Sequence, residues 1–234
     1  MFKGFSRLAS CATIVAATLS PMAAHAVIID FEGDDLGATQ LAPGDSVTTN
    51  GFVLTQGFDA GLIDVGTGLG AAAPTNNNTQ FYTNTNDGEL IFTSLGGLPF
   101  SLNGFDAAFV PLLGSHAAAQ VIGIVAFATA MDGTQFGTIF GLGDTTSTTK
   151  GSPFITFAGA ADFGTFTNLK TLEFFTCAVV NGQVCLTPTK NNGQFALDNV
   201  NLTIAAPVPE PETTALLALG LMVLTAVARR RRSR

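Results

Sequence analysis

The stretch QVIGIVAFATAMDGTQFGTIF, residues 120–140, decides the fold class. Residues 121–131 are apolar almost without interruption. Asp132 and Gly133 follow as a tight-turn pair, after which residues 135–140 form a returning arm, so the stretch predicts a β-hairpin. Because the first arm is apolar on both faces, we expect it to be a central strand that is covered on both sides.

Short apolar runs bounded by turn residues recur along residues 27–206, and a helical period is almost absent. About eleven strands at this spacing predict an all-β fold, a jelly-roll-like β-sandwich. We expect strands at residues 27–31, 51–57, 61–65, 80–83, 89–93, 100–110, 120–131, 135–140, 154–157, 170–179 and 195–204. The aromatic residues expected in the core are Phe52, Phe58, Phe81, Phe92, Phe127, Phe157 and Phe174.

The chain has 234 residues and a formal net charge of −7, which is unevenly distributed. Residues 27–206 hold fifteen acidic residues against three cations, Lys150, Lys170 and Lys190, and no arginine. A domain this acidic repels phosphates, so nucleic acid is excluded as a partner. The apolar fraction of 47%, with twenty Phe, is enough to fill a core and argues against disorder.

Residues 1–26 have the three parts of a secretory signal peptide. Lys3 and Arg7 form a charged beginning, an apolar run follows, and Ala24-His25-Ala26 supplies small residues on either side of a histidine. Cleavage is expected between Ala26 and Val27. An uncleaved membrane anchor would need about 20 apolar residues, and this run is shorter. The segment predicts export of residues 27–206 across the inner membrane.

The C-terminal segment, residues 207–234, contains a stiff spacer, an uncharged run and a basic cluster in that order. The spacer includes Pro209, Glu210 and Pro211, and proline disfavours helix there. Residues 213–228 carry no charge and are expected to form a single transmembrane helix, although sixteen residues give only about 24 Å. The arginines at 229–232 would keep the tail in the cytoplasm.

This arrangement resembles the PEP-CTERM sorting signal of exopolysaccharide-producing Gram-negative bacteria. The matching features are Pro209-Glu210-Pro211, the apolar helix and the arginine cluster. The resemblance implies processing near the Pro-Glu-Pro by an exosortase after transient insertion in the inner membrane, and delivery to the cell surface or extracellular matrix. The alternative is a C-terminal anchor that is never cut. The order of the body segments also resembles PEP-CTERM proteins, including a subgroup marked by Gln194-Phe195-x-x-Asp198.

Chemistry-bearing residues are few in the exported part. Cys177 and Cys185 flank an Asn181-Gly182 turn, so a hairpin would bring their sulfurs together, and we expect a disulfide in an oxidising compartment. His116 is the one histidine after residue 26 and is expected to be a solvated loop residue. Residues 66–71 imitate a dinucleotide-binding loop but precede an Ala-Ala-Pro segment, so we expect a turn without an anion site. No nucleophilic triad is expected, and the chain is predicted not to be an enzyme.

Three functions are compatible with these features. The first is a structural or adhesive role in an exopolysaccharide or biofilm layer. The second is a carbohydrate-binding module that uses Tyr82 and the loop at residues 76–78, although sugar platforms usually need Trp or Tyr and the chain has one Tyr and no Trp. The third, less favoured, is a secreted glycan-active enzyme with a pair of carboxylates.

In the last predicted strand the alternation of apolar residues shifts by one position, and this shift indicates a candidate calcium site. Phe195 and Leu197 share one parity, whereas Val200 and the following apolar residues share the other, so a β-bulge is expected at Asp198-Asn199. In jelly-roll carbohydrate-binding modules, a structural calcium ion often joins a Glu after the first strand to an Asp in the last. Glu32, with Asp30 and Asp34 close by, and Asp198 are the corresponding residues. The alternative is that Asp198 caps a turn and Glu32 is solvated.

Overall fold

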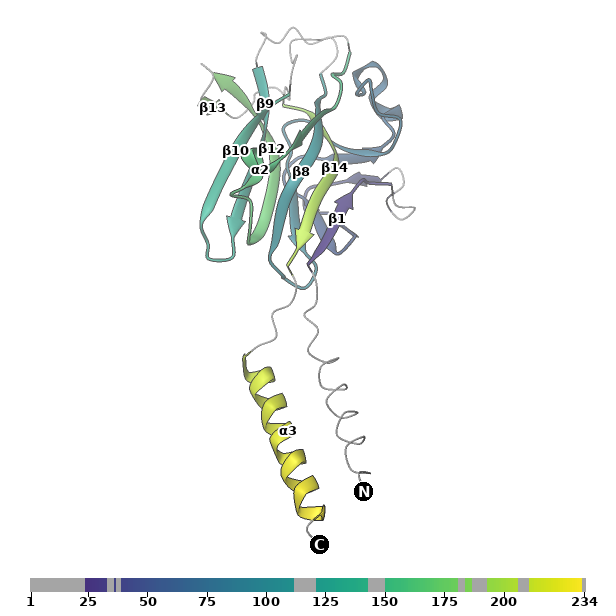
Figure 1. The fold of residues 1–234 in the computed structure, drawn as a ribbon. Helices are drawn as coiled ribbons and strands as arrows, with labels where there is room; N and C mark the ends of the chain where they lie inside the picture. The colour runs from purple at the N-terminus through teal and green to yellow at the C-terminus, as the bar shows by residue number, and fades with distance from the viewer. Residues whose placement is uncertain are drawn as a thin grey trace. The chain divides into compact units, whose positions relative to one another are not determined.

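The computed structural model describes residues 24–32, 36, 39–111, 121–142, 150–180, 184–186, 193–205 and 211–232. Residues 24–205 form one compact unit, whose regular elements are almost all strands (Figure 1). Fourteen strands are present in the described residues, and hydrogen bonds connect them into one antiparallel sheet. This sheet folds over into two layers that pack face to face, which we call the first and the second sheet. The predicted β-sandwich is confirmed.

The first sheet contains the hairpin predicted from residues 120–140. Its strands are, in spatial order, β10 (Gln135–Gly141), β9 (Val121–Ala130), β12 (Leu169–Val180), β7 (Leu90–Ser94), β4 (Phe52–Gln56) and β3 (Ser46–Thr49). Gln135 pairs with Thr129, which confirms the hairpin. However, β9 is second from the edge, and only its inward face is fully buried. On the outward face Val125 is buried, whereas Val121 is 55% exposed and Phe127 is half-buried, so the prediction that both faces are covered was only partly correct.

The second sheet is organised around β14 (Phe195–Ile204). On one side β14 pairs with β8 (Phe100–Phe109), which in turn pairs with β11 (Ile155–Ala158). On the other side its two halves have different neighbours. The first half pairs with β6 (Phe81–Asn84), followed by β5 (Gly61–Asp64) and β2 (Thr39–Leu41), and the second half pairs with β1 (His25–Ile29). A pairing of Leu169 with Phe100 connects the two sheets at a corner.

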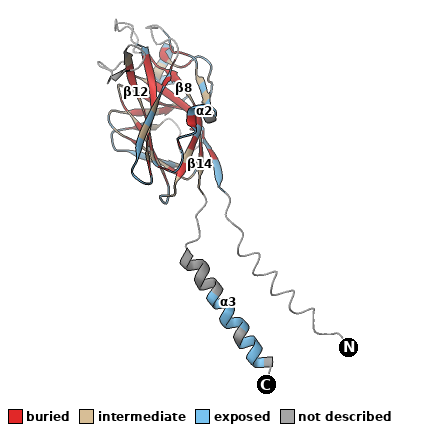
Figure 2. Ribbon diagram, turned by 60° about the vertical axis from the view of Figure 1, so that its left-hand side comes forward, coloured by how far each residue is buried: buried red, intermediate tan, exposed pale blue. Residues whose placement is uncertain are grey.

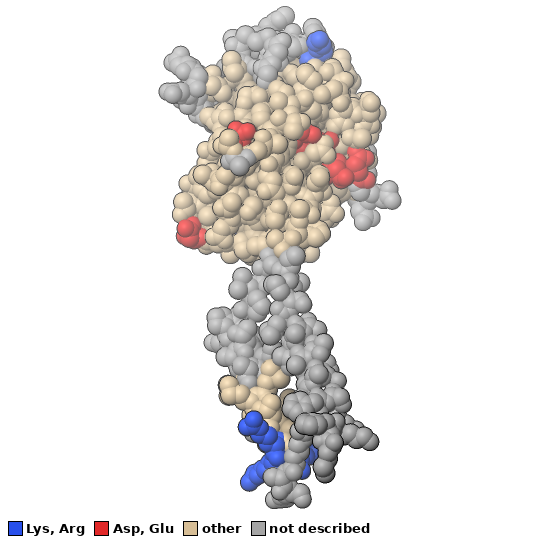
Figure 3. Space-filling view, viewed as in Figure 1, with Lys and Arg blue, Asp and Glu red and all other residues tan. Residues whose placement is uncertain are grey.

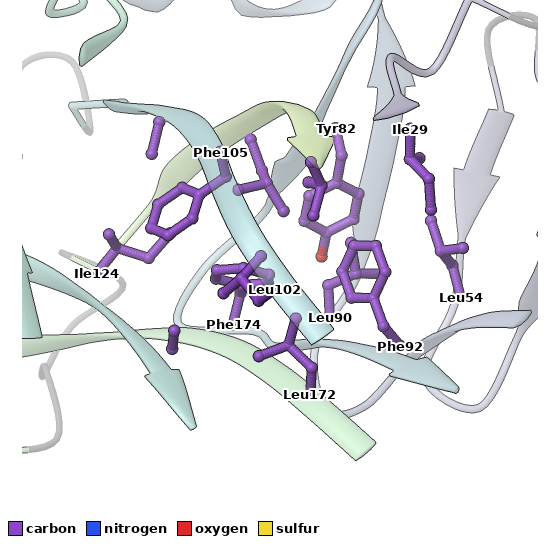
Figure 4. Close-up of a cluster of buried hydrophobic side chains, with 14 of the residues drawn as sticks. Ile29, Leu54, Tyr82, Leu90, Phe92, Leu102, Phe105, Ile124, Leu172 and Phe174 are labelled. Atoms are coloured by element: carbon purple, nitrogen blue, oxygen red, sulfur yellow. The ribbon is translucent and has the colours of Figure 1, made fainter. Parts of the chain in front are cut away.

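Phenylalanine is the most frequent residue of the core between the sheets. Figure 2 shows that buried residues run along the strands of the sandwich. Phe105 on β8 lies at its centre. Its ring centroid is 4.9 Å from that of Phe174 and 5.1 Å from those of Phe140 and Phe157. The short helix α2 (Ala160–Phe163) adds Phe163, 5.7 Å from Phe105. Figure 4 shows Phe105 and Phe174 from opposite sheets among other buried side chains.

The predicted core aromatics were only partly correct. Four of them are buried, namely Phe52, Phe81, Phe92 and Phe174. Phe127 and Phe157 are half-buried. Phe58 is 49% exposed, so its assignment to the core was wrong. The chain leaves β4 after Gln56, and Asp59 has a positive φ of 54°, so Phe58 lies in a turn rather than on a strand.

Three strands that the sequence did not predict are β2, β3 and β13 (Val184–Leu186). They are short, and β2 and β3 have no apolar run because Thr, Ser and Gln fill most positions. The segment expected to be a turn at residues 66–71 is instead a short 3-10 helix, η2 (Thr67–Ala72). The carboxylate of Asp64 accepts hydrogen bonds from Val65 N, Gly68 N and the Thr67 hydroxyl, which lower its pKa. The chain's own carboxylate thus satisfies these donors.

The bulge predicted in the last strand is confirmed, and β8 contains a second one. Asp198 pairs with Asp106, Asn201 with Gly104, and Leu202 with Leu102. Along this ladder β14 first contains one extra residue, and then β8 contains one, so the two irregularities compensate. Asn199 has a positive φ of 49°, a conformation that Asn adopts more readily than most residues.

Residues 206–210 lie outside the described part of the chain, and α3 (Pro211–Arg232) follows. Proline is well suited to the first helical position because the N–H that it lacks would have no partner there. A helix over the predicted residues 213–228 is confirmed, but the prediction that it spans a membrane is not. Within the described residues, no helix combines the length and hydropathy that a crossing requires. The uncharged run has only sixteen residues, fewer than the about 20 of a typical span.

Replacing Phe105 by alanine should destabilise the sandwich strongly. The substitution leaves a cavity among four other rings, and comparable Phe→Ala changes in cores cost about 3–5 kcal/mol. The matched control, Phe58→Ala, removes an exposed ring and should change the free energy of unfolding by less than about 0.5 kcal/mol. Urea unfolding of both variants measures the difference. Equal effects would contradict the central place given to Phe105.

Candidate functional site

Acidic and amide side chains gather where β1 ends and β14 bulges. Figure 3 shows a group of acidic side chains at this side of the sandwich. Asp198 accepts a 2.7 Å hydrogen bond from Asn77 Nδ2 at one carboxylate oxygen and a 2.7 Å bond from Asn199 N at the other. The Asn199 side chain in turn donates to Asp106 Oδ2 at 2.8 Å. At the bulge, Asn199 therefore donates hydrogen bonds to two carboxylates from neighbouring strands, with its backbone N–H to Asp198 and its side chain to Asp106.

Asp198 is the most constrained carboxylate of this group, because it is only 2% exposed. Burial raises its pKa to about 6. The hydrogen bonds from Asn199 and Asn77 oppose this shift, whereas the negative charges of Asp106 and Glu32 add to it. Like charges on directly opposite residues of two strands are destabilising. The arrangement thus favours either a proton or a cation at Asp198.

Glu32 reaches the same place from β1. The preceding residue, Phe31, is buried and has a positive φ of 58°, which is rare for a bulky side chain and turns the chain after the strand. Glu32 Oε1 accepts a 2.7 Å hydrogen bond from Gln80 N. The side-chain oxygen of Gln80 is buried and has no hydrogen-bond partner. An unsatisfied buried acceptor, in a residue whose backbone N–H binds a carboxylate, is a feature that a bound cation would relieve.

Glu32 and Asp198, which the sequence predicted as calcium ligands, therefore lie near each other, but each carboxylate has its own hydrogen-bond donors. Glu32 and Asp198 interact electrostatically. Asp30 accepts a bond from Glu32 N at 3.3 Å, and Asp34 lies outside the described residues. In the part of the chain that the structure describes, no group of three or more His, Cys, Asp or Glu side chains is arranged to hold a metal ion.

Sequence reasoning missed Asp106, Asn77 and Gln80. A signal for Asp106 was present, since Phe100 and Leu102 share one parity whereas Phe105 and Phe109 share the other. This phase change is the same kind that revealed the bulge in β14. Asn77 and Gln80 lie in a polar loop whose path no periodicity could reveal.

Tyr82 does not form a sugar platform, and that part of the sequence hypothesis was wrong. Its side chain is fully buried, and Figure 4 shows it among the core residues. The hydroxyl donates a 2.7 Å hydrogen bond to Gln56 Oε1, and burial raises its pKa. Tyr82 is the neighbour of Leu197 on β14, and its ring lies 6.0 Å from that of Phe195. The residue closes the core rather than facing a ligand.

The loop at residues 76–78 is also mainly structural. Asn76 pairs with the backbone of Phe154 in both directions, accepting from its N–H at 2.6 Å and donating to its carbonyl at 3.2 Å. Asn77 is committed to Asp198, and Asn78 is exposed. Asn76 and Asn77 thus hold the loop against the second sheet, at β14 and at the segment that leads into β11.

A pocket of about 380 Å³ lies on the outer side of the second sheet, at the beginning of β8. Its polar lining comes from Ser101, Asn103 and Thr167, and the rest of the lining is Leu102, Phe163 and two glycines. Asn103 Nδ2 donates to Asn201 Oδ1 and to the Thr203 hydroxyl at 3.2 and 2.9 Å. The amide of Asn103 is thus held in place by β14.

The remaining predicted site residues have different positions. The bond between Ala26 and Val27 lies inside β1, and residues 1–23 lie outside the described part. Cys177 on β12 is disulfide-bonded. Cys185 on β13 is paired with Val179, which confirms the predicted hairpin, and its bond to Cys177 stays a prediction. Of the sorting residues, Pro211 begins α3, whereas Pro209, Glu210 and also His116 are not described.

Comparisons with solved structures found low similarity. The chain is 10% identical to the CBM22-1–CBM22-2 tandem domain of Xyn10C from Paenibacillus barcinonensis, with a TM-score of 0.35 and coverage of 82% of this chain and 49% of that one. A two-domain protein of unknown function from Bacteroides fragilis is 12% identical, with a TM-score of 0.32 and coverages of 71% and 47%. The enzymatically active domain of tailspike protein 4 from bacteriophage CBA120 is 13% identical, with a TM-score of 0.27 and coverages of 71% and 19%.

No curated protein sequence matches the chain. The chain spans about half the length of the first solved structure, and such scores carry no inference about ligands. The segment that contains the Pro-Glu-Pro is different. Residues 207–232 match the family model of the PEP-CTERM protein-sorting motif. The chain therefore carries a PEP-CTERM sorting domain, which implies an exported protein that an exosortase processes and directs to the cell surface.

Proposed function

We propose that this chain is a structural or adhesive component of the extracellular polymer layer of a Gram-negative bacterium. The supporting observation is the sorting motif at residues 207–232, which follows a β-sandwich whose last strand ends at Ile204. In this proposal the exosortase delivers a stable, acidic sandwich to the surface or matrix, where exopolysaccharide is its partner. The sandwich acts by binding and spacing, and it performs no catalysis.

Carbohydrate binding is the second candidate function, but it requires a surface other than the one around Tyr82. The open face of the first sheet, described in the next subsection, favours it. A glycan-active enzyme stays the least favoured proposal, because the pocket at the beginning of β8 is lined by no carboxylate.

The processed protein should begin at Val27 and end near Pro209. Signal peptidase and the exosortase would remove residues 1–26 and the segment that contains α3, respectively. Intact-mass analysis of material released from the producing cells measures both ends. Recovery of a species that retains the arginines at 229–232 would contradict the sorting step and would support a protein that stays membrane-anchored.

We also propose that the cluster around Asp198 holds a structural calcium ion. Glu32, Asp198 and the unsatisfied oxygen of Gln80 would supply hard oxygen ligands, which suit calcium. The ion would neutralise a carboxylate that is buried beside two others, and it would pin β1 to β14 at the bulge. Its role would be to stabilise the fold.

Calcium should raise the melting temperature of the exported protein as its concentration passes the dissociation constant, about 10⁻⁴–10⁻³ M for extracellular sites. Thermal melts with calcium and with chelator measure the shift, and Asp198→Ala should abolish it. The matched control is Asp162→Ala on α2, which removes an exposed carboxylate and should keep the full response. Equal melting temperatures in calcium and chelator would refute the site.

A further inference from the structure

The outward face of the first sheet is apolar at its centre although it remains partly exposed. On β9, β12 and β7 the outward residues Phe127, Phe175 and Ile91 are half-buried, and on β10 Ile139 is 38% exposed. A solvated sheet face normally carries polar residues. Threonines and a serine do occupy the rows on either side. They are Ser46, Thr48, Thr55, Thr93, Thr129 and Thr171.

Two phenylalanines and two glutamates alternate at the centre of this face. Phe127 on β9 is directly opposite Glu173 on β12, and Phe175 lies two residues further along β12 on the same side. Glu89 immediately precedes β7, whose Leu90 pairs with Phe174, so Glu89 is beside Phe175. The two rings have their centroids 6.5 Å apart. We refer to Phe127, Phe175, Glu89 and Glu173 as the Phe–Glu patch.

Two side chains of this patch lie over glycines of neighbouring segments. A Cβ on Gly137 of β10 would lie 3.2 Å from Cδ2 of Phe127, so the ring leans over a position without a side chain. A Cβ on Gly57, just after β4, would overlap the side chain of Glu89, which lies across it in the same way. The large side chains therefore spread over the sheet instead of standing up from it.

The two glutamates have no partner that stabilises their charge. Within the described residues, neither carboxylate is hydrogen-bonded or ion-paired. Burial raises the pKa of both, and the charge of Glu173 raises that of Glu89 further. Apart from the disulfide-bonded Cys177, the only other titratable side chain on these four strands is Lys170, which is exposed at the bulge of β12 between Leu169 and Thr171. Half-buried acceptors of this kind cost stability unless a donor is supplied from outside.

The chemistry of the patch selects its occupant. An anionic polymer or a nucleic acid would be repelled by the two carboxylates and by the acidic body of the protein. A second copy of this chain, packed face to face, would bring four carboxylates without counter-charges into one dry interface, which is costly. A neutral sugar chain avoids both penalties, because its hydroxyls donate to carboxylates and its C–H faces pack on aromatic rings.

We propose that the Phe–Glu patch binds a strand of neutral polysaccharide. This inference rests on the proposed matrix role and adds to it the binding surface and the class of partner. Phe127 and Phe175 provide the apolar platform. Glu89 and Glu173 orient the sugar by accepting hydrogen bonds from its hydroxyls, and the threonines on both sides extend the polar contact along the sheet.

Affinity electrophoresis of the protein released from producing cells tests the binding. The probes are three neutral polysaccharides (laminarin, galactomannan and xyloglucan), with alginate as the anionic comparison. We expect retardation by at least one neutral polymer and none by alginate. Phe127→Ala and Phe175→Ala should each weaken that binding about tenfold, as truncation of a central aromatic contact does. No retardation by any neutral polymer, or equal retardation of the Phe variants and the wild type, would overturn the proposal.

Glu173→Gln separates binding from folding. The amide keeps the shape of the side chain but removes a half-buried charge that has no partner, so the melting temperature should rise while the affinity for the polysaccharide falls. A purely structural role would move only the melting temperature. Asn103→Ala in the pocket of the second sheet and Tyr82→Phe in the core are the matched controls, and both should bind as the wild type does. Loss of binding in Asn103→Ala would place the site on the other sheet.

The same variants distinguish this inference from the proposed function. The released wild type and the variants of the Phe–Glu patch can be found in the matrix in equal amounts. In that case the patch is not the binding surface, although the matrix role stands. If the wild type is never released, the proposed function fails, whereas electrophoresis of the purified chain still tests the patch.

Discussion

The ladder between β8 and β14 is the interaction on which the rest of the sandwich depends. It places Phe105 and Phe195 in the core, and β14 supports β1 and β6 on its other side. The ladder is irregular in both strands, and the irregularities cancel, so the register recovers within a few residues. Gly104 is required at this point because a Cβ there would lie 2.7 Å from the carbonyl oxygen of Phe157 on β11. A substitution at Gly104 would therefore disturb three strands at once.

Much of this architecture could be predicted from the sequence, because strand formation leaves a local signal. The hairpin of β9 and β10 follows from its apolar arms and its Asp-Gly turn, and the bulge in β14 follows from its change of phase. What failed depends on long-range packing. Tyr82 looked available because a tyrosine in a polar neighbourhood resembles a surface residue, yet Gln56 from another strand satisfies its hydroxyl in the core. Strands without apolar runs, such as β3, form because they hydrogen-bond to the edge of a neighbouring strand, which is β4 in this case.

The acidic cluster and the Phe–Glu patch differ in how far the sequence revealed them. Glu32 was found by its position after the first strand and Asp198 by the phase change in the last strand, whereas Asn77, one of the two donors to Asp198, comes from a loop 121 residues away. The patch was hidden because the same apolar residues of β9 that indicate a strand also suggest complete burial. Only the observed position of β9, with one face toward the core and one partly open, shows that its outward residues are available.

The pairing of β1 with the end of β14 has a mechanical consequence. His25 is opposite Ile204, so the segment that leads to the sorting motif leaves the sandwich from the end of a strand that has neighbours on both sides. A pull transmitted through that segment enters β14 along its axis, perpendicular to the ladder hydrogen bonds. The bonds are then loaded together, in shear, rather than opened one after another as in peeling an edge strand. The sandwich is thus built to resist tension from the end that follows β14.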